Sequence, residues 1–198
     1  MTSHVIFFLY FKFQCYDYFR EKHVDVSYSM LDGINNYISI LESHDIKTTF
    51  FTLGEIADVF AGNSAPQEKD AFKDGEIPFI RTSDVGQIKK GEIFTSRDLL
   101  PIEARDKFRI FPAGTILIPK SGASTFLNHR VITRAEAAIS SHLAGVIAKE
   151  EFVISEYLYL FMTLIDAKNL VQDASYPSLN LKQIQAIEVP IPGKQIQM

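Results

Sequence analysis

Four short segments, in a fixed order along the chain, carry the polar side chains best suited to chemistry. They span residues 77–85, 114–124, 140–147 and 175–184. Each joins an apolar, strand-like run to a patch of small polar or basic residues, so the run can act as a scaffold while the patch reaches a partner. Arg, Lys, Ser, Thr and Asn are residue types that contact the phosphates and base edges of nucleic acids. The pattern therefore favours a nucleic-acid partner.

The first segment contains the strongest candidate for reading a base. Arg81 follows a predicted strand and precedes Thr82 and Ser83, so its guanidinium fork can meet a guanine edge in the major groove. The alternative is a surface salt bridge between Arg81 and Asp84 or another carboxylate. The predicted DNA-binding residues are Arg81, Thr82, Ser83, Lys89, Lys90, Lys120, Ser121, Ser124, Thr125, Asn128 and Arg130.

Several of these candidates have plainer alternatives. Lys89 and Lys90 can contact phosphates, but a solvated turn explains them equally well. Asn128 can pair with adenine, and Arg130 can hold phosphate or guanine. An ordinary loop with solvated polar residues would contain the same two side chains.

A weaker group of polar residues has structural or chemical alternatives. Ser178 and Asn180 are better explained as caps of a short helix over residues 180–185 than as DNA contacts. Ser121 and His142 could be imagined as a nucleophile and its base, but two unrelated loop residues is the better interpretation. The weaker candidates for DNA contact are Ser141, His142, Tyr176, Ser178 and Asn180.

Sequence signatures of common enzyme and metal sites do not occur in the chain. There is no Walker loop, no dinucleotide glycine fingerprint and no Gly-x-Ser-x-Gly elbow. The five histidines and the single cysteine lack the spacing of a zinc site. We therefore expect neither a catalytic residue nor a metal site.

The charge of the chain is unevenly distributed. The whole sequence carries a formal net charge of −4, yet residues 69–134 hold 12 Lys or Arg against 8 Asp or Glu, a net charge of +4. This stretch includes the first two polar patches. A DNA backbone responds to charge within a Debye length of about 10 Å, so a local basic face can attract it although the chain as a whole is acidic.

Length and composition indicate a soluble globular protein. The 198 residues suffice for one domain with a full core, alone or with an appendage. The one cysteine, Cys15, excludes an internal disulfide and favours a reducing, cytoplasmic compartment. The apolar run over residues 5–11 is far shorter than the ~20 residues of a spanning helix and lacks the flanks of a signal peptide. No membrane partner is expected.

Hydrophobic periodicity divides the chain into a helical beginning and a strand-rich remainder. Apolar residues recur at helical spacing over 28–43 and again over 50–60, with a polar connector at 44–49. Strands are predicted over 77–80, 92–95, 115–119, 143–148 and 186–191, and helices over 155–170 and 180–185. The predicted fold is α+β: a compact domain with a mixed or antiparallel sheet and flanking short helices, plus an N-terminal accessory helix.

Several short motifs follow one another in a specific order and spacing. They are Leu-Gly-Glu-Ile-Ala at 53–57 with Gly62 after it, Ile-Pro-Phe-Ile-Arg-Thr-Ser-Asp at 77–84, Gly-Thr-Ile-Leu-Ile at 114–118 leading to Ser-Gly-Ala at 121–123, Ser-Ser-His at 140–142, Pro-Ser-Leu-Asn at 177–180 and Ile-Glu-Val-Pro-Ile-Pro at 187–192. Over about 140 residues the chain thereby resembles the target recognition domain of type I restriction-modification specificity subunits.

The resemblance implies a non-catalytic role in a prokaryotic defence system. Each such domain reads one half of a split double-stranded DNA target and directs adenine methylation or cleavage by partner subunits. The partners implied are the methyltransferase (modification) subunit and the restriction subunit. S-adenosylmethionine, ATP and Mg²⁺ belong to those partners, so no cofactor is expected on this chain.

The resemblance also implies a domain organisation. Residues 1–46 form an accessory segment that matches nothing in the family, and residues 47–192 form the DNA target recognition domain. Residues 193–198 correspond to a truncated start of the long spacer helix that follows the domain in the family. Two copies could pair as a homodimer to read a symmetric site. The alternative function is a truncated structural or interaction fragment that does not bind DNA.

Overall fold

The computed structural model describes residues 37–39, 41–43, 45–68, 70–171, 175, 177–193 and 197. The N-terminal apolar run, most of the helix predicted over 28–43, and Tyr176 lie outside the described residues. Residues 37–39 and 41–43 are helical, and Tyr37 and Leu41 are buried in the core. None of the helices in the described ranges is long and apolar enough to cross a membrane.

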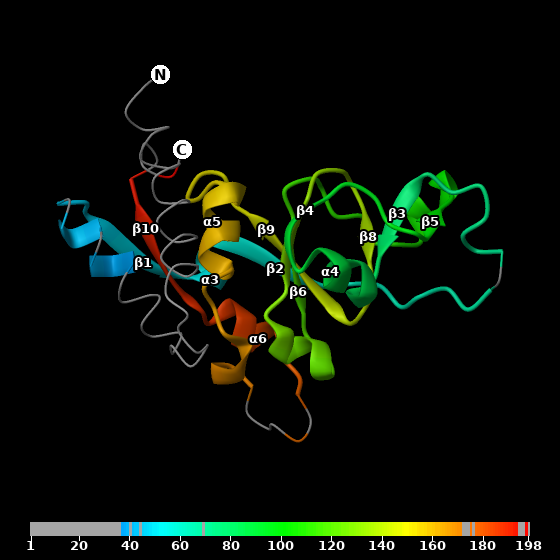
Figure 1. The fold of residues 1–198 in the computed structure, drawn as a ribbon. Helices are drawn as coiled ribbons and strands as arrows, with labels where there is room; N and C mark the ends of the chain where they lie inside the picture. The colour runs from blue at the N-terminus through cyan, green and yellow to red at the C-terminus, as the bar shows by residue number, and fades with distance from the viewer. Residues whose placement is uncertain are drawn as a thin grey trace.

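Short strands are interspersed with short helices along the chain (Figure 1). The figure shows β1, β10 and α5 at one end of the molecule and β3 with β5 at the other. The elements are β1 Thr48–Thr52, α3 Leu53–Ile56, β2 Ala57–Ala61, β3 Ile77–Ile80, α4 Thr82–Ile88, β4 Lys90–Ile93, β5 Leu99–Leu100, η1 Ile102–Asp106, β6 Ile116–Pro119, η2 Ala123–Leu127, β7 Arg130–Thr133, β8 Ala138–Ile139, β9 Leu143–Ala148, α5 Ser155–Met162, η3 Ala167–Asn169, α6 Leu181–Gln185 and β10 Glu188–Pro192.

The strands form a central five-stranded sheet flanked by two smaller ones. The central order is β2-β9-β6-β7-β4, in which β4 and β7 are parallel and the other neighbours are antiparallel. A three-stranded sheet, β5-β3-β8, combines an antiparallel and a parallel pair, and β1 pairs with β10 in an antiparallel ribbon. The predicted α+β fold with mixed sheets and short helices is therefore confirmed.

Both faces of the central sheet are covered by apolar side chains. In β6, Ile116 and Ile118 belong to the hydrophobic cluster that contains α5, α6 and β10, whereas Leu117 belongs to a second cluster with Phe111 and Val131. Successive strand residues point to opposite faces, so one strand supplies both clusters. Burial on both faces explains why β6 and β9 read as nearly continuous apolar runs in the sequence.

A close approach in the second cluster requires a glycine. A Cβ added at Gly145 in β9 would lie 2.4 Å from Cε1 of Phe111. Phe111 is completely buried, and packed interiors leave little room for such a ring to move. Gly145 therefore lets the Phe111 ring lie directly on the backbone of the sheet.

Most of the predicted strands are confirmed, with shifted boundaries. The predictions for 77–80, 115–119 and 143–148 correspond to β3, β6 and β9, and those for 92–95 and 186–191 to β4 and β10. The helix predicted over 180–185 is α6. The helix predicted over 155–170 begins as α5 at Ser155 but ends at Met162, and residues 167–169 form only a short 3₁₀ turn. Ile154 is the N-cap of α5.

The helix predicted over 50–60 is wrong. The Glu55 carboxylate accepts hydrogen bonds from the Thr52 backbone N–H (2.6 Å) and from its hydroxyl (2.7 Å), which begins a single helical turn after β1. Ala57 then returns to an extended backbone, and Val59 pairs with Val146 in the sheet. The predicted polar connector at 44–49 also overlaps β1, which begins at Thr48.

Among the elements that were not predicted from the sequence, two carry candidate site residues. Helix α4 follows β3 directly, and the Asp84 carboxylate accepts a hydrogen bond from the Arg81 backbone N–H (2.7 Å) at its start. Asp84 is therefore a capping residue of α4. Strand β7 begins at Arg130, in a region expected to be a polar loop.

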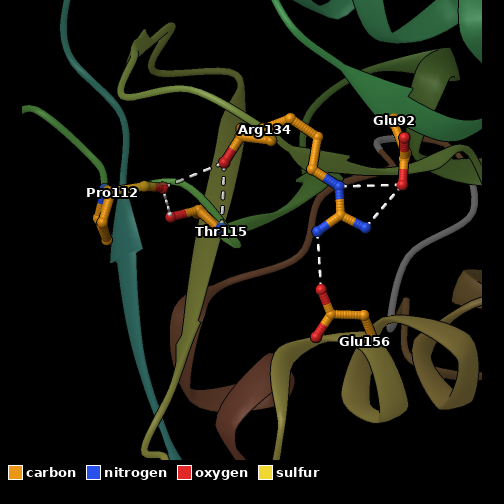
Figure 2. A network of polar contacts seen from close by, with 6 residues as sticks. Glu92, Pro112, Thr115, Arg134 and Glu156 are labelled. Carbon is orange, nitrogen blue, oxygen red and sulfur yellow. Dashed lines mark hydrogen bonds and ion pairs between the residues drawn. The ribbon is translucent and has the colours of Figure 1, made fainter.

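An ion-pair network joins β4, β7 and α5 at one end of the sheet (Figure 2). The Arg134 guanidinium lies between two carboxylates: Nη2 is 2.6 Å from Glu92 and Nη1 is 2.7 Å from Glu156. Beside it, the Pro112 carbonyl accepts hydrogen bonds from the Thr115 and Thr133 hydroxyls. The hydrogen bond from Arg134 holds the pKa of Glu156 below its usual range.

Replacing Gly145 should test the close contact with Phe111. Gly145→Ala is expected to lower the free energy of unfolding by about 1–3 kcal/mol, because the added methyl overpacks a buried ring. Urea unfolding followed by circular dichroism measures the change. Gly193→Ala is the matched control, since its Cβ would meet nothing within 4 Å. Equal stability of the two variants would contradict the packing argument.

The Arg134 network should contribute a pH-dependent increment of stability. Because the folded-state pKa of Glu156 is lowered, its contribution is present above the ordinary value of 4.5 and is lost as the pH falls through the folded-state pKa. Glu156→Gln should destabilise the protein by roughly 0.5 kcal/mol at neutral pH, an amount limited by solvent screening, and the difference should vanish as the pH falls below the folded-state pKa of Glu156.

Urea unfolding at several pH values measures this difference. Glu150→Gln is the control, because Glu150 is exposed and forms no ion pair with any residue in the described ranges. A difference for Glu156→Gln that is constant with pH would argue against the ion pair as its origin.

Candidate functional site

Strand directions bring the predicted site segments to one edge of the central sheet. β2 and β6 end at this edge, and β9, β7 and β4 begin there, as the pairs Ala61↔Ala144, Pro119↔Leu143 and Lys90↔Arg130 require. β3 also ends there, because the Ser140 backbone N–H donates to the Ile80 carbonyl (2.9 Å). We call this surface the polar edge: it consists of residues 62–67, 81–90, 120–129, 140–142 and 177–179.

Backbone hydrogen bonds connect the four segments in a row along the polar edge. Segment 140–147 lies between segments 77–85 and 114–124: the Lys120 N–H donates to the His142 carbonyl (2.9 Å). Segment 175–184 follows on the other side, where the Leu179 N–H donates to the Lys120 carbonyl (2.9 Å). Segments separated by up to about 100 positions in the sequence therefore form one continuous surface.

A polar pocket of about 370 Å³ lies where the first and third segments meet. It is lined by hydroxyl, amide, imidazole and guanidinium groups. Gly62 lets the chain approach this place, because a Cβ there would lie 2.2 Å from the Ser140 carbonyl oxygen. The lining residues are Ser64, Ala65, Gln67, Arg81, Thr82, Ser83, Ser140, Ser141 and His142.

Arg81 lies at the wall of this pocket and is held from several directions. Its Nε is 2.7 Å from the Asp98 carboxylate, with the two side chains 35% and 27% exposed. Its guanidinium carbon lies 5.1 Å from the centroid of the Phe79 ring and 5.4 Å from that of Phe72. The salt bridge considered from the sequence is therefore present, but its partner is Asp98 rather than Asp84. Thr82 and Ser83 form the first turn of α4 beside it.

A group of cations forms a second part of the polar edge. Lys89 and Lys90 precede and begin β4, and His129 precedes β7, which lies alongside. Partial desolvation lowers the pKa of His129, and the charges of Lys89, Arg130 and Lys90 lower it further. The Lys90 amine donates to the Thr163 carbonyl (3.3 Å), and desolvation together with the Arg130 charge lowers its pKa. This mutual repulsion makes the place favourable for an anion.

The second segment contributes a turn with a free cation. Within the described part of the chain, Lys89, Lys90 and Lys120 form no ion pair. The Ser124 hydroxyl donates to the Ser121 carbonyl (2.9 Å), which closes the turn after β6. Lys120, Ser121 and Ser124 are all partly accessible, so this turn can reach a partner.

Three predicted DNA-binding residues are buried or hydrogen-bonded within the fold instead. Thr125 is fully buried. The Asn128 amide nitrogen donates to the Asp166 carboxylate (2.8 Å), and its amide oxygen accepts from the Ala167 backbone N–H (2.8 Å). Its backbone is left-handed at φ 52, a conformation that Asn tolerates well. Asn128 therefore joins two turns, and its amide is not available to pair with adenine.

Arg130 is the largest correction to the sequence prediction. Its side chain is only 1% exposed, and its guanidinium donates to the backbone carbonyls of His129 (2.8 Å) and Ile165 (3.4 Å). Burial lowers the pKa of Arg130 to about 10, which the nearby Asp166 partly opposes. The side chain remains charged at neutral pH, and it ties the start of β7 to the turn after α5. Its burial removes it from the candidate interface.

The fourth segment has the structural role preferred from the sequence. The Asn180 side chain accepts a hydrogen bond from the Gln183 backbone N–H (2.9 Å), and the Gln183 side chain accepts one from the Asn180 N–H (2.8 Å). This reciprocal capping box starts α6. Ser178 forms an isolated bridge with Ser121, which attaches the segment to the polar edge.

Sequence reasoning missed the residues that support Arg81. Asp98, Phe72 and Phe79 lie 17, 9 and 2 positions from Arg81, so no local spacing connects all of them. Ser64 and Gln67, which line the pocket, were not among the candidates named from the sequence. The position of Phe79 before Arg81 in a strand was the one available signal, because it places an aromatic ring near the guanidinium.

The opposite edge of the sheet has a different electrostatic character. There Arg134 is neutralised by Glu92 and Glu156, and Lys149 lies 3.8 Å from Asp58. Basic side chains at that edge are thus paired with carboxylates, whereas three lysines at the polar edge are not. The polar edge is therefore the better candidate for binding an anionic partner.

Comparisons with known proteins agree with this geometry. A family model described as "Type I restriction modification DNA specificity domain" matches residues 46–198. The specificity subunit of the type I restriction enzyme MjaIX from Methanocaldococcus jannaschii is 28% identical over 156 residues, which cover 73% of this chain. The chain spans about a third (33%) of the length of that relative.

Solved structures of type I systems share the fold. A chain from a study of complex assembly and conformational transition of the type I R-M system superposes with a TM-score of 0.58 at 14% identity, covering 85% of this chain and 42% of that one. The HsdS subunit from Thermoanaerobacter tengcongensis gives 0.54 at 19% identity, covering 76% and 34%. The S subunit from M. genitalium gives 0.54 at 18% identity, covering 84% and 40%. Since the family model matches well over half of the sequence, this chain belongs to the type I restriction-modification DNA specificity domain family.

Proposed function

We propose that this chain is a DNA sequence-recognition module of a type I restriction-modification complex and that it binds double-stranded DNA with its polar edge. One observation carries the proposal: strand order and direction gather four sequence-distant polar segments and three unpaired lysines on one surface. Membership of the family supports the same conclusion. In this role the module reads one half of a split target.

The chemistry of the polar edge suits both parts of DNA recognition. Lys89, Lys90 and Lys120 supply charge for phosphates, which position a protein on the duplex. Arg81 supplies a donor fork for base edges, and Thr82 and Ser83 lie next to it. The surface thus offers both backbone contact and direct readout, although the whole chain carries a net charge of −4.

The proposal assigns the reactions themselves to partner subunits. The methyltransferase subunit would bring S-adenosylmethionine and methylate adenine, and the restriction subunit would use ATP and Mg²⁺ to drive cleavage. This chain would be non-catalytic and bind none of these cofactors. It would act in the cytoplasm, and two copies could form a homodimer that reads a symmetric target.

A methylome measurement tests this function. The chain is co-expressed with the methyltransferase subunit of its own locus in a host without adenine methylation, and modified bases are mapped by sequencing. The expected result is a new split motif that disappears when the chain is omitted, and a symmetric motif would indicate two copies per complex. Soluble proteins with no methylation would favour the alternative of a fragment that does not bind DNA.

Lysines of the polar edge should contribute to affinity without contributing to sequence preference. Lys89→Gln and Lys120→Gln should each reduce the slope of log affinity against log salt concentration by about 0.9, because each phosphate contact releases about that many counterions. Fluorescence anisotropy of the complex with labelled duplexes, over a range of salt concentrations, measures this slope. All sequences should weaken alike.

Lys149→Gln provides the matched control for both variants. Lys149 is paired with Asp58 at the opposite edge of the sheet, so its loss should leave the slope unchanged. A larger effect from Lys149 than from Lys89 and Lys120 would place the DNA on another surface.

A further inference from the structure

We propose that the pocket beside Arg81 is a guanine-reading subsite and that Asp98 and Phe79 are positioning residues that orient Arg81 for it. This inference rests on the proposed function in DNA recognition. It specifies the base that the subsite takes and assigns a role to two residues that do not themselves contact DNA.

The hydrogen bonds of Arg81 leave Nη1 and Nη2 of its guanidinium available to a base. The Asp98 carboxylate engages Arg81 through Nε alone, at 2.7 Å. Neither Nη1 nor Nη2 of Arg81 donates to any residue within the described ranges. An arginine held at Nε still presents its two terminal nitrogens as a planar pair of donors. Such a pair matches O6 and N7 of guanine, the acceptors that this base shows in the major groove.

The aromatic rings restrict where the guanidinium can go. Phe79 is completely buried, and its ring lies 5.1 Å from the Arg81 guanidinium carbon. Phe72 contacts both partners, since its ring is 5.4 Å from the same carbon and 5.6 Å from the Phe79 ring. A cation over an aromatic face gains electrostatic stabilisation. Because Phe79 cannot move, that stabilisation fixes the arginine relative to the sheet.

Asp98 is itself held in place by the strand that carries Arg81. Its backbone carbonyl accepts a hydrogen bond from the Phe79 N–H (2.8 Å) and another from the Ser96 hydroxyl (2.8 Å). Arg81 is fixed at its backbone too, through its N–H to Asp84 (2.7 Å). Phe79 lies in β3, Arg81 directly follows it, and Asp98 is hydrogen-bonded to it, so the ring, the guanidinium and the carboxylate are all anchored to the same strand. This reduces the conformational entropy that the long side chain would lose on binding a base.

The other groups of the pocket suit a base edge better than an apolar ligand. Ser83, Ser141 and His142 line it and are accessible. Ser140, which is 4% exposed, also lines it, and its hydroxyl has no hydrogen-bond partner among the described residues. Hydroxyl and imidazole groups donate and accept hydrogen bonds, so they can complement the remaining polar atoms of a base pair.

A second arginine–carboxylate pair, Arg105 with Glu136, lacks the surroundings of Arg81. Arg105 and Glu136 also approach to 2.7 Å, but their side chains are 45% and 54% exposed. Among the described residues Arg105 contacts no aromatic ring. It lies on η1, away from the polar edge. Exposed pairs of this kind contribute little to stability, which makes this one a suitable control.

The experiment uses the full chain together with the methyltransferase subunit of its locus. Enrichment from a library of randomised duplexes first identifies the preferred sequence. Dissociation constants are then measured for that duplex and for duplexes with each G·C pair replaced in turn. The variants are Arg81→Lys, Asp98→Ala and Asp98→Asn, with Glu136→Ala as the control. Thermal unfolding verifies that each variant is folded.

The expected result is a loss of discrimination at one G·C pair. Arg81→Lys and Asp98→Ala should each reduce the preference at that same pair by roughly tenfold, within the factor of about 5 to 150 that a bidentate arginine–guanine contact supplies. Asp98→Asn should lose less, because its amide oxygen can still accept the Nε hydrogen. Glu136→Ala should leave every preference unchanged.

Three other outcomes would overturn the inference, and they differ from one another. Uniform weakening of all duplexes by Arg81→Lys would make Arg81 a phosphate contact. Undiminished discrimination in Asp98→Ala would deny Asp98 a positioning role. If the wild-type complex enriches no sequence at all, the proposed DNA-recognition function fails and this inference fails with it.

Discussion

Burial of the central sheet on both faces is the constraint on which the rest of the structure depends. Ile116 and Ile118 point into one hydrophobic cluster and Leu117 into the other, so neither face of β6 can present a polar group to a partner. The ends of β6 are therefore where its neighbouring residues can present polar groups. Because β2 and β6 run one way and β9 runs the other, the loops of non-consecutive segments collect at the same edge. The packed sheet thus acts as a scaffold, and the loops at its edge can contact a partner.

The two edges of this frame use charge in opposite ways. At one edge Arg134 lies between Glu92 and Glu156 and joins three elements. At the other edge the lysines have no carboxylate partner within the described ranges. Desolvation, together with the charges of Lys89, Arg130 and Lys90, depresses the pKa of His129 there. A carboxylate that pairs with a cation cancels its contribution to the electrostatic potential around the protein, whereas cations that cluster together strengthen that potential. A chain with a net negative charge can consequently still have one surface that attracts phosphate.

Two arginines that the sequence predicted to bind DNA illustrate how burial decides the role of a side chain. Arg130 is 1% exposed and donates to backbone carbonyls, and removing those hydrogen bonds would leave a charge in the core. Because a buried charge without hydrogen-bond partners is unfavourable, the guanidinium stays where these carbonyls are. Arg81 keeps a third of its side chain accessible and has one carboxylate at Nε. Arginine is thus a structural residue at position 130 and is available for recognition at position 81.

The sequence by itself determined the fold class, the principal strands and the identity of the polar segments. Those features depend on local patterns: the apolar runs of β3, β6 and β9, the Asn180 cap of α6, and an excess of basic residues over 69–134. The helical spacing of 50–60 was misleading, because the hydrogen bonds of Thr52 with Glu55 support only one turn between two strands. Only the tertiary structure decided that Arg130 is buried, that the Asn128 amide bonds to Asp166 and Ala167, and that Asp98 is the partner of Arg81. Burial and long-range pairing depend on the order of strands in the sheet, and strand order is not encoded in the spacing of residues along the chain.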